Sequence, residues 1–181
     1  MERWTASSAS QRIMAAIMEQ NKINLISEQS RQQIDRWVAK YPPEQKQSAV
    51  MAALSIVQEA NGGWLTTELM DAVAEYLEMP SIAVYEVGSF YSMYEHKPVG
   101  RHKICVCTNI SCLLCGSDDV VRHLEEKLGI KMGQTTPDGK FTLKVVECLG
   151  ACVGAPMFQV GREYYEHLTP EKIDAILDKL D

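Results

Sequence analysis

The 181-residue sequence lacks both an excess of basic residues and a long apolar run. Its formal charge at neutral pH is −6, from 24 acidic and 18 basic residues, and Lys and Arg form no cluster. Because nucleic-acid-binding surfaces need a positive face, this composition argues against DNA or RNA as a partner. No apolar run approaches the roughly 20 residues that span a bilayer, so we expect no direct membrane insertion.

Two further absences concern export and dinucleotide binding. Glu2 and Glu19 interrupt the apolar character of the first 22 residues, so no secretory signal is predicted. Six cysteines without such a signal indicate a reducing compartment, where ligand or free-thiol roles are commoner than disulfides. The sequence also lacks a glycine-rich turn between a strand and a helix, since Asn61-Gly62-Gly63 ends a helical pattern. We therefore expect no dinucleotide site on this chain.

The first half of the chain has helical periodicity. Four amphipathic segments are predicted: one from Ser27 to Tyr41, one from Glu44 to Ala60, one opened by Thr66 or Thr67, and one opened by Pro80-Ser81. Their expected inward residues are Ile34, Trp37, Val38, Tyr41, Val50, Leu54, Val57, Met70, Val73, Ala74, Leu77, Val84, Val87, Tyr91 and Tyr94. Residues 27–95 therefore predict a helical bundle. Residues 1–26 are interpreted as an N-terminal extension, either disordered or held by a partner, and only faintly similar to an organelle transit peptide.

After a linker at residues 96–100, the spacing of apolar residues changes from a purely helical pattern to one in which strands alternate with helices. Strands are predicted over His102–Cys107, Phe141–Val146 and Pro156–Val160, with a helix opened by Ser117 or Asp118 and a last helix capped by Thr169-Pro170. The inward helix residues are expected to be Val121, Leu124, Leu128, Ile173, Ile176, Leu177 and Leu180. The order β-α-β-β-α over residues 96–181 is close to a thioredoxin-like core. The predicted class is α+β, a helical bundle followed by a small α/β domain.

Four cysteines form two clasps, Cys107-x4-Cys112 and Cys148-x3-Cys152, with 35 residues between them. Each clasp follows a predicted strand, so four thiolates can converge from two loops. The spacing differs from the C-x2-C knuckles of zinc ribbons, and an iron–sulfur cluster, being wider than one metal ion, suits it better. Gly150 permits a tight wrap in which backbone N–H groups point at sulfur. The sequence therefore favours a two-iron centre held by these cysteines.

Three other interpretations of the cysteines stay open at this point. A structural Zn(Cys)4 site would make the chain a binding module without a redox role. Cys112-Leu113-Leu114-Cys115 is itself a C-x-x-C motif, which suggests thiol–disulfide exchange. The cysteines could also be buried structural thiols. Cys105 is expected to pack as a small hydrophobic residue, and Cys115 is a spare thiol.

Aromatic and proline positions give two smaller expectations. Phe90, Tyr91 and Tyr94 are expected to pack in the core, with an interface to a partner as the alternative. Pro156 precedes a strand at the place where thioredoxins keep a cis proline, so it is a candidate for a cis peptide bond.

Four stretches of sequence carry a resemblance to a known family. They are Val84-Tyr85-Glu86-Val87-Gly88-Ser89-Phe90-Tyr91-Ser92, Pro98-Val99-Gly100-Arg101-His102, Gly133-Gln134-Thr135-Thr136-Pro137-Asp138-Gly139-Lys140-Phe141 and Glu147-Cys148-Leu149-Gly150-Ala151-Cys152. From about Ser27 onward the chain resembles the E-type subunit of NADH–quinone oxidoreductase (respiratory complex I). Related chains serve as small subunits of NAD-linked hydrogenases and formate dehydrogenases, which are the alternative assignment.

The resemblance implies a thioredoxin-like domain that carries one [2Fe-2S] cluster on Cys107, Cys112, Cys148 and Cys152. It also implies two partners: a flavoprotein subunit that binds NADH and FMN, and the larger iron–sulfur subunit of the peripheral arm. On this interpretation the chain is a subunit of an enzyme and carries electrons, while NADH and FMN bind to the partner. The expected location is the cytoplasm, at the inner face of the membrane as part of a complex, with the mitochondrial matrix as the alternative.

Overall fold

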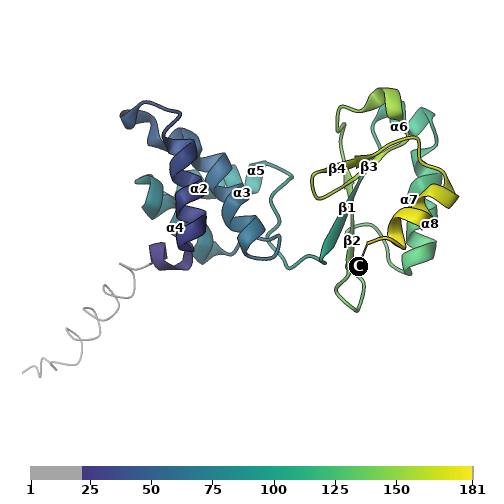
Figure 1. Ribbon diagram of the computed structural model, residues 1–181, viewed down its shortest axis with the longest axis horizontal. Coiled ribbons are helices and arrows are strands. Elements are labelled where there is room, and N and C mark those ends of the chain that lie inside the picture. Colours follow the sequence, from purple (N-terminus) through teal and green to yellow (C-terminus); the bar gives the residue numbers. More distant parts are fainter. Residues whose placement is uncertain (1–21, 181) are drawn as a thin grey trace, which may run out of the picture. The chain divides into compact units, whose positions relative to one another are not determined.

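The computed structural model describes residues 22–180 (Figure 1). The chain divides into two compact units, with the boundary in the sequence between Lys97 and Pro98, and each is described by itself. Apart from residues 22–26, the predicted N-terminal extension lies outside the described residues.

The first unit is a bundle of short helices, as predicted. Its elements are η1 (Lys22–Leu25), α2 (Glu28–Val38), η2 (Pro43–Ala49), α3 (Val50–Ala60), α4 (Thr67–Leu77) and α5 (Ser81–Phe90). The predicted caps at Ser27 and Thr66 are confirmed, because each side chain accepts a hydrogen bond from a backbone N–H of the first helical turn. Ile26 is buried in the core of this unit, so packing begins before Ser27.

Three expectations for the bundle are wrong. Trp37 and Tyr41 are 41% and 36% exposed, so neither lies in the core. The helix α2 ends at Val38, before Tyr41, and the Lys40 ammonium lies 3.4 Å from the Trp37 ring centroid. The predicted helix from Glu44 to Ala60 is divided into η2 and α3, since Gln45 has non-helical dihedral angles.

The third correction concerns the end of α5. The helix stops at Phe90, because Tyr91 is already extended, so Tyr91 and Tyr94 do not continue its stripe. Phe90 is 81% exposed and lies outside the core. Tyr94 is buried as expected, and its hydroxyl donates to the carbonyl of Met51 at 2.9 Å.

Asp71 on α4 joins three elements of the bundle. Its carboxylate forms an ion pair with Lys22 at 2.8 Å and accepts a short hydrogen bond from the Tyr85 hydroxyl. Burial alone would raise the pKa of Asp71, but the hydrogen bonds from Lys22, Tyr85 and Ser81 outweigh burial and lower it below 3.8. The folded bundle therefore favours the ionised form of this side chain.

The second unit is a four-stranded sheet with helices. Its elements are β1 (His102–Cys107), α6 (Ile110–Leu114), α7 (Ser117–Leu128), β2 (Phe141–Val146), η3 (Cys152–Gly154), β3 (Phe158–Val160), β4 (Glu163–Tyr165) and α8 (Pro170–Leu177). The strand order is β2-β1-β3-β4, in which β1 and β2 are parallel and the other pairs antiparallel. Figure 1 shows α7 and α8 beside one another against the sheet.

Three short elements of this unit were not predicted. The residues after the Gly161-Arg162 turn form β4, α6 begins within the first cysteine clasp and carries Cys112, and η3 begins at Cys152. The predicted order β-α-β-β-α therefore gains a strand, a short α-helix and a 3-10 helix. The predicted cap of α8 is confirmed, because the Thr169 hydroxyl accepts from the Lys172 N–H at 3.3 Å. The Ala155–Pro156 peptide bond is cis.

Strand register determines where the cysteines lie. Cys107, at the end of β1, is level with Val146, at the end of β2. Because parallel strands end at the same edge of a sheet, the loops that follow β1 and β2 leave the sheet side by side. Ile104 and Val106 point into the main core, whereas Cys107 belongs to a small separate cluster with Cys112 and Met157. The fold thus places both cysteine clasps at one end of the sheet.

Gly100, just before β1, lies at the opposite end of the sheet and packs closely against the start of β2. A Cβ atom there would lie 2.8 Å from the backbone carbonyl carbon of Phe141, the first residue of β2. The Gly100 N–H donates to the buried Thr142 hydroxyl at 2.6 Å. Only a residue without a side chain allows this close approach.

Candidate metal centre

Cys107 and Cys112 form a buried inner pair of thiols. Each is only 2% exposed, and Met157, which is also buried, packs against them. Burial, followed by hydrogen bonding with Cys107, raises the pKa of the Cys112 thiol to about 11, while a backbone hydrogen bond from Met157 acts in the opposite direction. At this pKa the Cys112 thiol is protonated at neutral pH, and a bound metal would displace its proton.

Cys148 and Cys152 form an exposed outer pair. Their sulfur atoms are 3.6 Å apart, and the Gly150 N–H donates to Cys148 Sγ at 3.4 Å. Gly150 has a φ of +86°, which turns the backbone so that this N–H faces the sulfur. The hydrogen bond with Cys148 raises the pKa of Cys152, and the Ser111 hydroxyl, as a donor, lowers it. The predicted glycine-bearing wrap is present on this side of the site.

The four thiols are therefore grouped two by two. Within residues 22–180, no three His, Cys, Asp or Glu side chains gather as the ligands of a single metal ion would. A Zn(Cys)4 site needs all four sulfurs around one point, whereas a [2Fe-2S] cluster takes two thiolates on each of its two irons. Backbone or hydroxyl donors also reach the sulfur of Cys112, Cys148 and Cys152. The donor set and its grouping fit a two-iron cluster.

Side-chain hydrogen bonds hold the two loops in place. Asn109 Nδ2 donates to Glu147 Oε2 at 2.8 Å, which joins the first cysteine loop to the second. The Tyr164 hydroxyl on β4 donates to the carbonyl of Leu149, between Cys148 and Cys152, at 2.8 Å. The sequence indicated small polar residues between Cys107 and Cys112, but it contained no signal for Tyr164, whose strand was not predicted.

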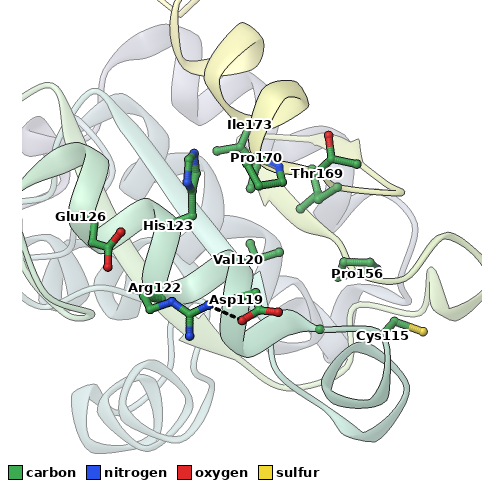
Figure 2. A pocket seen from close by; sticks show the side chains of 12 residues that line it. Cys115, Asp119, Val120, Arg122, His123, Glu126, Pro156, Thr169, Pro170 and Ile173 are labelled. Atoms are coloured by element: carbon green, nitrogen blue, oxygen red, sulfur yellow. Dashed lines mark hydrogen bonds and ion pairs between the residues drawn. The ribbon is translucent and has the colours of Figure 1, made fainter.

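The spare cysteines do not belong to the buried cluster of Cys107, Cys112 and Met157. Cys105 is half-buried in β1. Cys115 is exposed at the rim of a pocket of about 490 Å3, which also contains Pro156 and residues of α7 and α8 (Figure 2). In that pocket Arg122 pairs with Asp119.

The fold and the site define the class of protein. Residues 34–181 match the thioredoxin-like [2Fe-2S] ferredoxin family, which confirms the predicted fold and implies a [2Fe-2S] cluster. The E subunit of NADH-quinone oxidoreductase from Rickettsia bellii is 52% identical over 143 residues, which cover 79% of this chain and 86% of that one. An E subunit of the same enzyme from Rhizobium meliloti, numbered 2, is 44% identical over 148 residues, covering 82% and 86%. The chain belongs to the family of NADH-quinone oxidoreductase E subunits, as its sequence motifs indicated.

A solved structure shares the fold. The chain aligns with an NAD+-reducing [NiFe]-hydrogenase in the H2-reduced state with a TM-score of 0.62 and 22% identity. The alignment covers 72% of this chain and 22% of the hydrogenase chain, so the likeness concerns about a fifth of that protein. At this identity the likeness shows a common fold alone.

Proposed function

We propose that this chain is an electron-carrying subunit of an NADH-quinone oxidoreductase, with its [2Fe-2S] cluster bound by Cys107, Cys112, Cys148 and Cys152. The observation that carries the proposal is the grouping of these thiols into two pairs in a member of this family. When bound, a [2Fe-2S] cluster supplies a one-electron redox couple whose potential depends on hydrogen bonds to sulfur and on burial.

The protein contributes three features to this couple. The inner pair, packed against Met157, would hold one side of the cluster in a buried site. The outer pair lies at the surface, which gives the short path that electron transfer to a partner requires. Donors from Gly150, Ser111 and Met157 stabilise negative charge on sulfur, and they therefore favour the reduced form.

The proposed electron partner is the FMN of a flavoprotein subunit that also binds NADH, with a larger iron–sulfur subunit as a neighbour in the peripheral arm. Exposed apolar side chains next to the cysteines in the chain support docking there: Val153, beside Cys152, is 97% exposed, and Leu114 and Ile110, on the helix that carries Cys112, are 82% and 71% exposed. Apolar surface of this kind is typical of the core of a protein interface. We place the assembled complex at the cytoplasmic face of the membrane. No helix within residues 22–180 is long and apolar enough to cross a bilayer.

Metal analysis of the anaerobically purified full chain tests the cluster. We expect about two irons and two acid-labile sulfides per chain, as a [2Fe-2S] cluster requires, with visible absorption that bleaches on reduction. A colourless protein with a single zinc would contradict the proposal and support the structural zinc alternative.

Reduction by NADH tests the partner. In a mixture with the flavoprotein subunit, NADH should bleach the visible absorption of this chain. Without the flavoprotein, NADH should leave the absorption unchanged, because the proposed nucleotide site lies on the partner. Bleaching by NADH of the isolated chain would contradict this assignment.

A further inference from the structure

The two cysteine loops begin where the backbone ladder between β1 and β2 ends. At this end of the ladder, the Thr108 N–H donates to the carbonyl of Val146 at 3.3 Å. The next residues along the two loops are joined by their side chains, since Asn109 Nδ2 donates to Glu147 Oε2 at 2.8 Å. This contact, which we call the Asn109–Glu147 rung, extends the ladder by one side-chain step.

The rung connects the backbone segments that carry the two pairs of thiols. Asn109 follows Cys107 by two residues, and its Oδ1 accepts from the Ile110 N–H at 3.0 Å, which caps the helix that carries Cys112. Glu147 directly precedes Cys148. A single contact between side chains 38 residues apart therefore links the inner pair to the outer pair.

We propose that Asn109 and Glu147 are positioning residues for the cluster, and that their rung holds the outer pair at the distance from the inner pair that the cluster needs. The inference rests on the proposed function, because it concerns the four thiols assigned there. An exposed hydrogen bond of this kind contributes little to global unfolding. Its effect is expected in local opening of the loop that carries Cys148 and Cys152, and thus in how long the cluster is retained.

Three variants of the full chain separate the rung from helix capping and from charge. Asn109→Ser keeps a capping oxygen and the net charge, but its side chain is too short to reach Glu147. Asn109→Asp also keeps the cap, but it places two carboxylates together. Asn109→Asp with Glu147→Gln puts the acceptor at position 109 and the donor at position 147, so the rung is restored with reversed polarity and wild-type net charge.

The measurement is the rate at which visible absorption is lost in excess iron chelator, without oxygen. Relative to wild type, we expect loss about threefold faster in Asn109→Ser and about tenfold faster in Asn109→Asp. The double variant should return to within about twofold of wild type, because the two changes are coupled. Glu126→Gln, a charge change at an exposed residue of α7, serves as the matched control and should leave the rate unchanged.

The outcomes are distinct. The proposal is overturned if Asn109→Ser loses its cluster at the wild-type rate, or if the double variant loses its cluster as fast as Asn109→Asp does. Equal losses of thermal stability in all three variants would indicate a general structural role and would also overturn it. Failure of the proposed function looks different, because the wild-type chain itself would then contain no iron and sulfide.

Discussion

Ser111→Ala tests how a single hydroxyl tunes the outer pair. Ser111 lies on α6, is half-buried, and donates a hydrogen bond to Cys152, whose thiol pKa it lowers. The bond therefore stabilises negative charge on that sulfur. Negative charge on the sulfurs grows when a [2Fe-2S] cluster is reduced, so loss of the donor should make the reduction potential more negative.

The magnitude follows from the exposure of the bond. Cys152 is exposed, so water replaces part of the lost bond, and only the difference between the oxidised and reduced forms affects the potential. The effect should therefore stay below a tenfold change in the one-electron equilibrium, which is 59 mV, and we expect the potential to fall by about 20–45 mV.

The assay is a redox titration of the anaerobic full chain, followed by visible absorption or electron paramagnetic resonance. Ser111→Thr keeps the hydroxyl and should retain most of the wild-type potential. Ser117→Ala is the matched control: its hydroxyl is buried without a hydrogen-bond partner among the described residues, so its removal should not shift the potential. An unchanged potential in Ser111→Ala, or an equal shift in Ser117→Ala, would show that the Ser111 hydroxyl does not tune the outer pair.

Three further predictions concern the ligands and the two units. Cys148→Ser should abolish or perturb the visible spectrum while Cys105→Ser leaves it unchanged; the opposite pattern would show that the ligand register is wrong. Gly100→Ala should lower the free energy of unfolding by about 1–3 kcal/mol in urea titrations, because its Cβ would meet the backbone of β2. Gly88→Ala should cost less, because its Cβ would meet side-chain atoms alone, the Met70 sulfur at 2.9 Å and the His96 ring at 3.8 Å. The depressed pKa of Asp71 contributes to the free energy of unfolding above pH 3.8, and this contribution is lost as the pH falls below that value. In urea titrations on both sides of pH 3.8, the free energy of unfolding should therefore fall less with acidification in Asp71→Asn than in wild type.

Features that depend on neighbours in the chain could be predicted from the sequence. The caps at Ser27, Thr66 and Thr169 are local, since each side chain bonds to an N–H three residues later. The glycine turn at Gly150 is local for the same reason. The family could also be predicted, because its motifs are short stretches of sequence that need no folded structure to be compared.

Exposure at the ends of helices could not be predicted from the sequence. Periodicity placed Trp37 on an inward stripe, and Phe90 was expected to pack in the core with its aromatic neighbours, but Trp37 is 41% exposed and Phe90 81%. An apolar stripe shows which face of a helix is apolar, and it does not show how far the packed neighbours extend along that face. The strand β4 was missed because three residues give too short an alternation to recognise.

At the candidate site, the spacing of the cysteines was enough to predict two pairs and a tight wrap after β2. It could not predict that one pair is buried and the other exposed, because burial depends on Met157 and on the parallel pairing of β1 with β2. The same pairing brings Asn109 to Glu147 across 38 residues. Spacing in a chain limits which ligands can meet, whereas the sheet register determines which other side chains stand beside them.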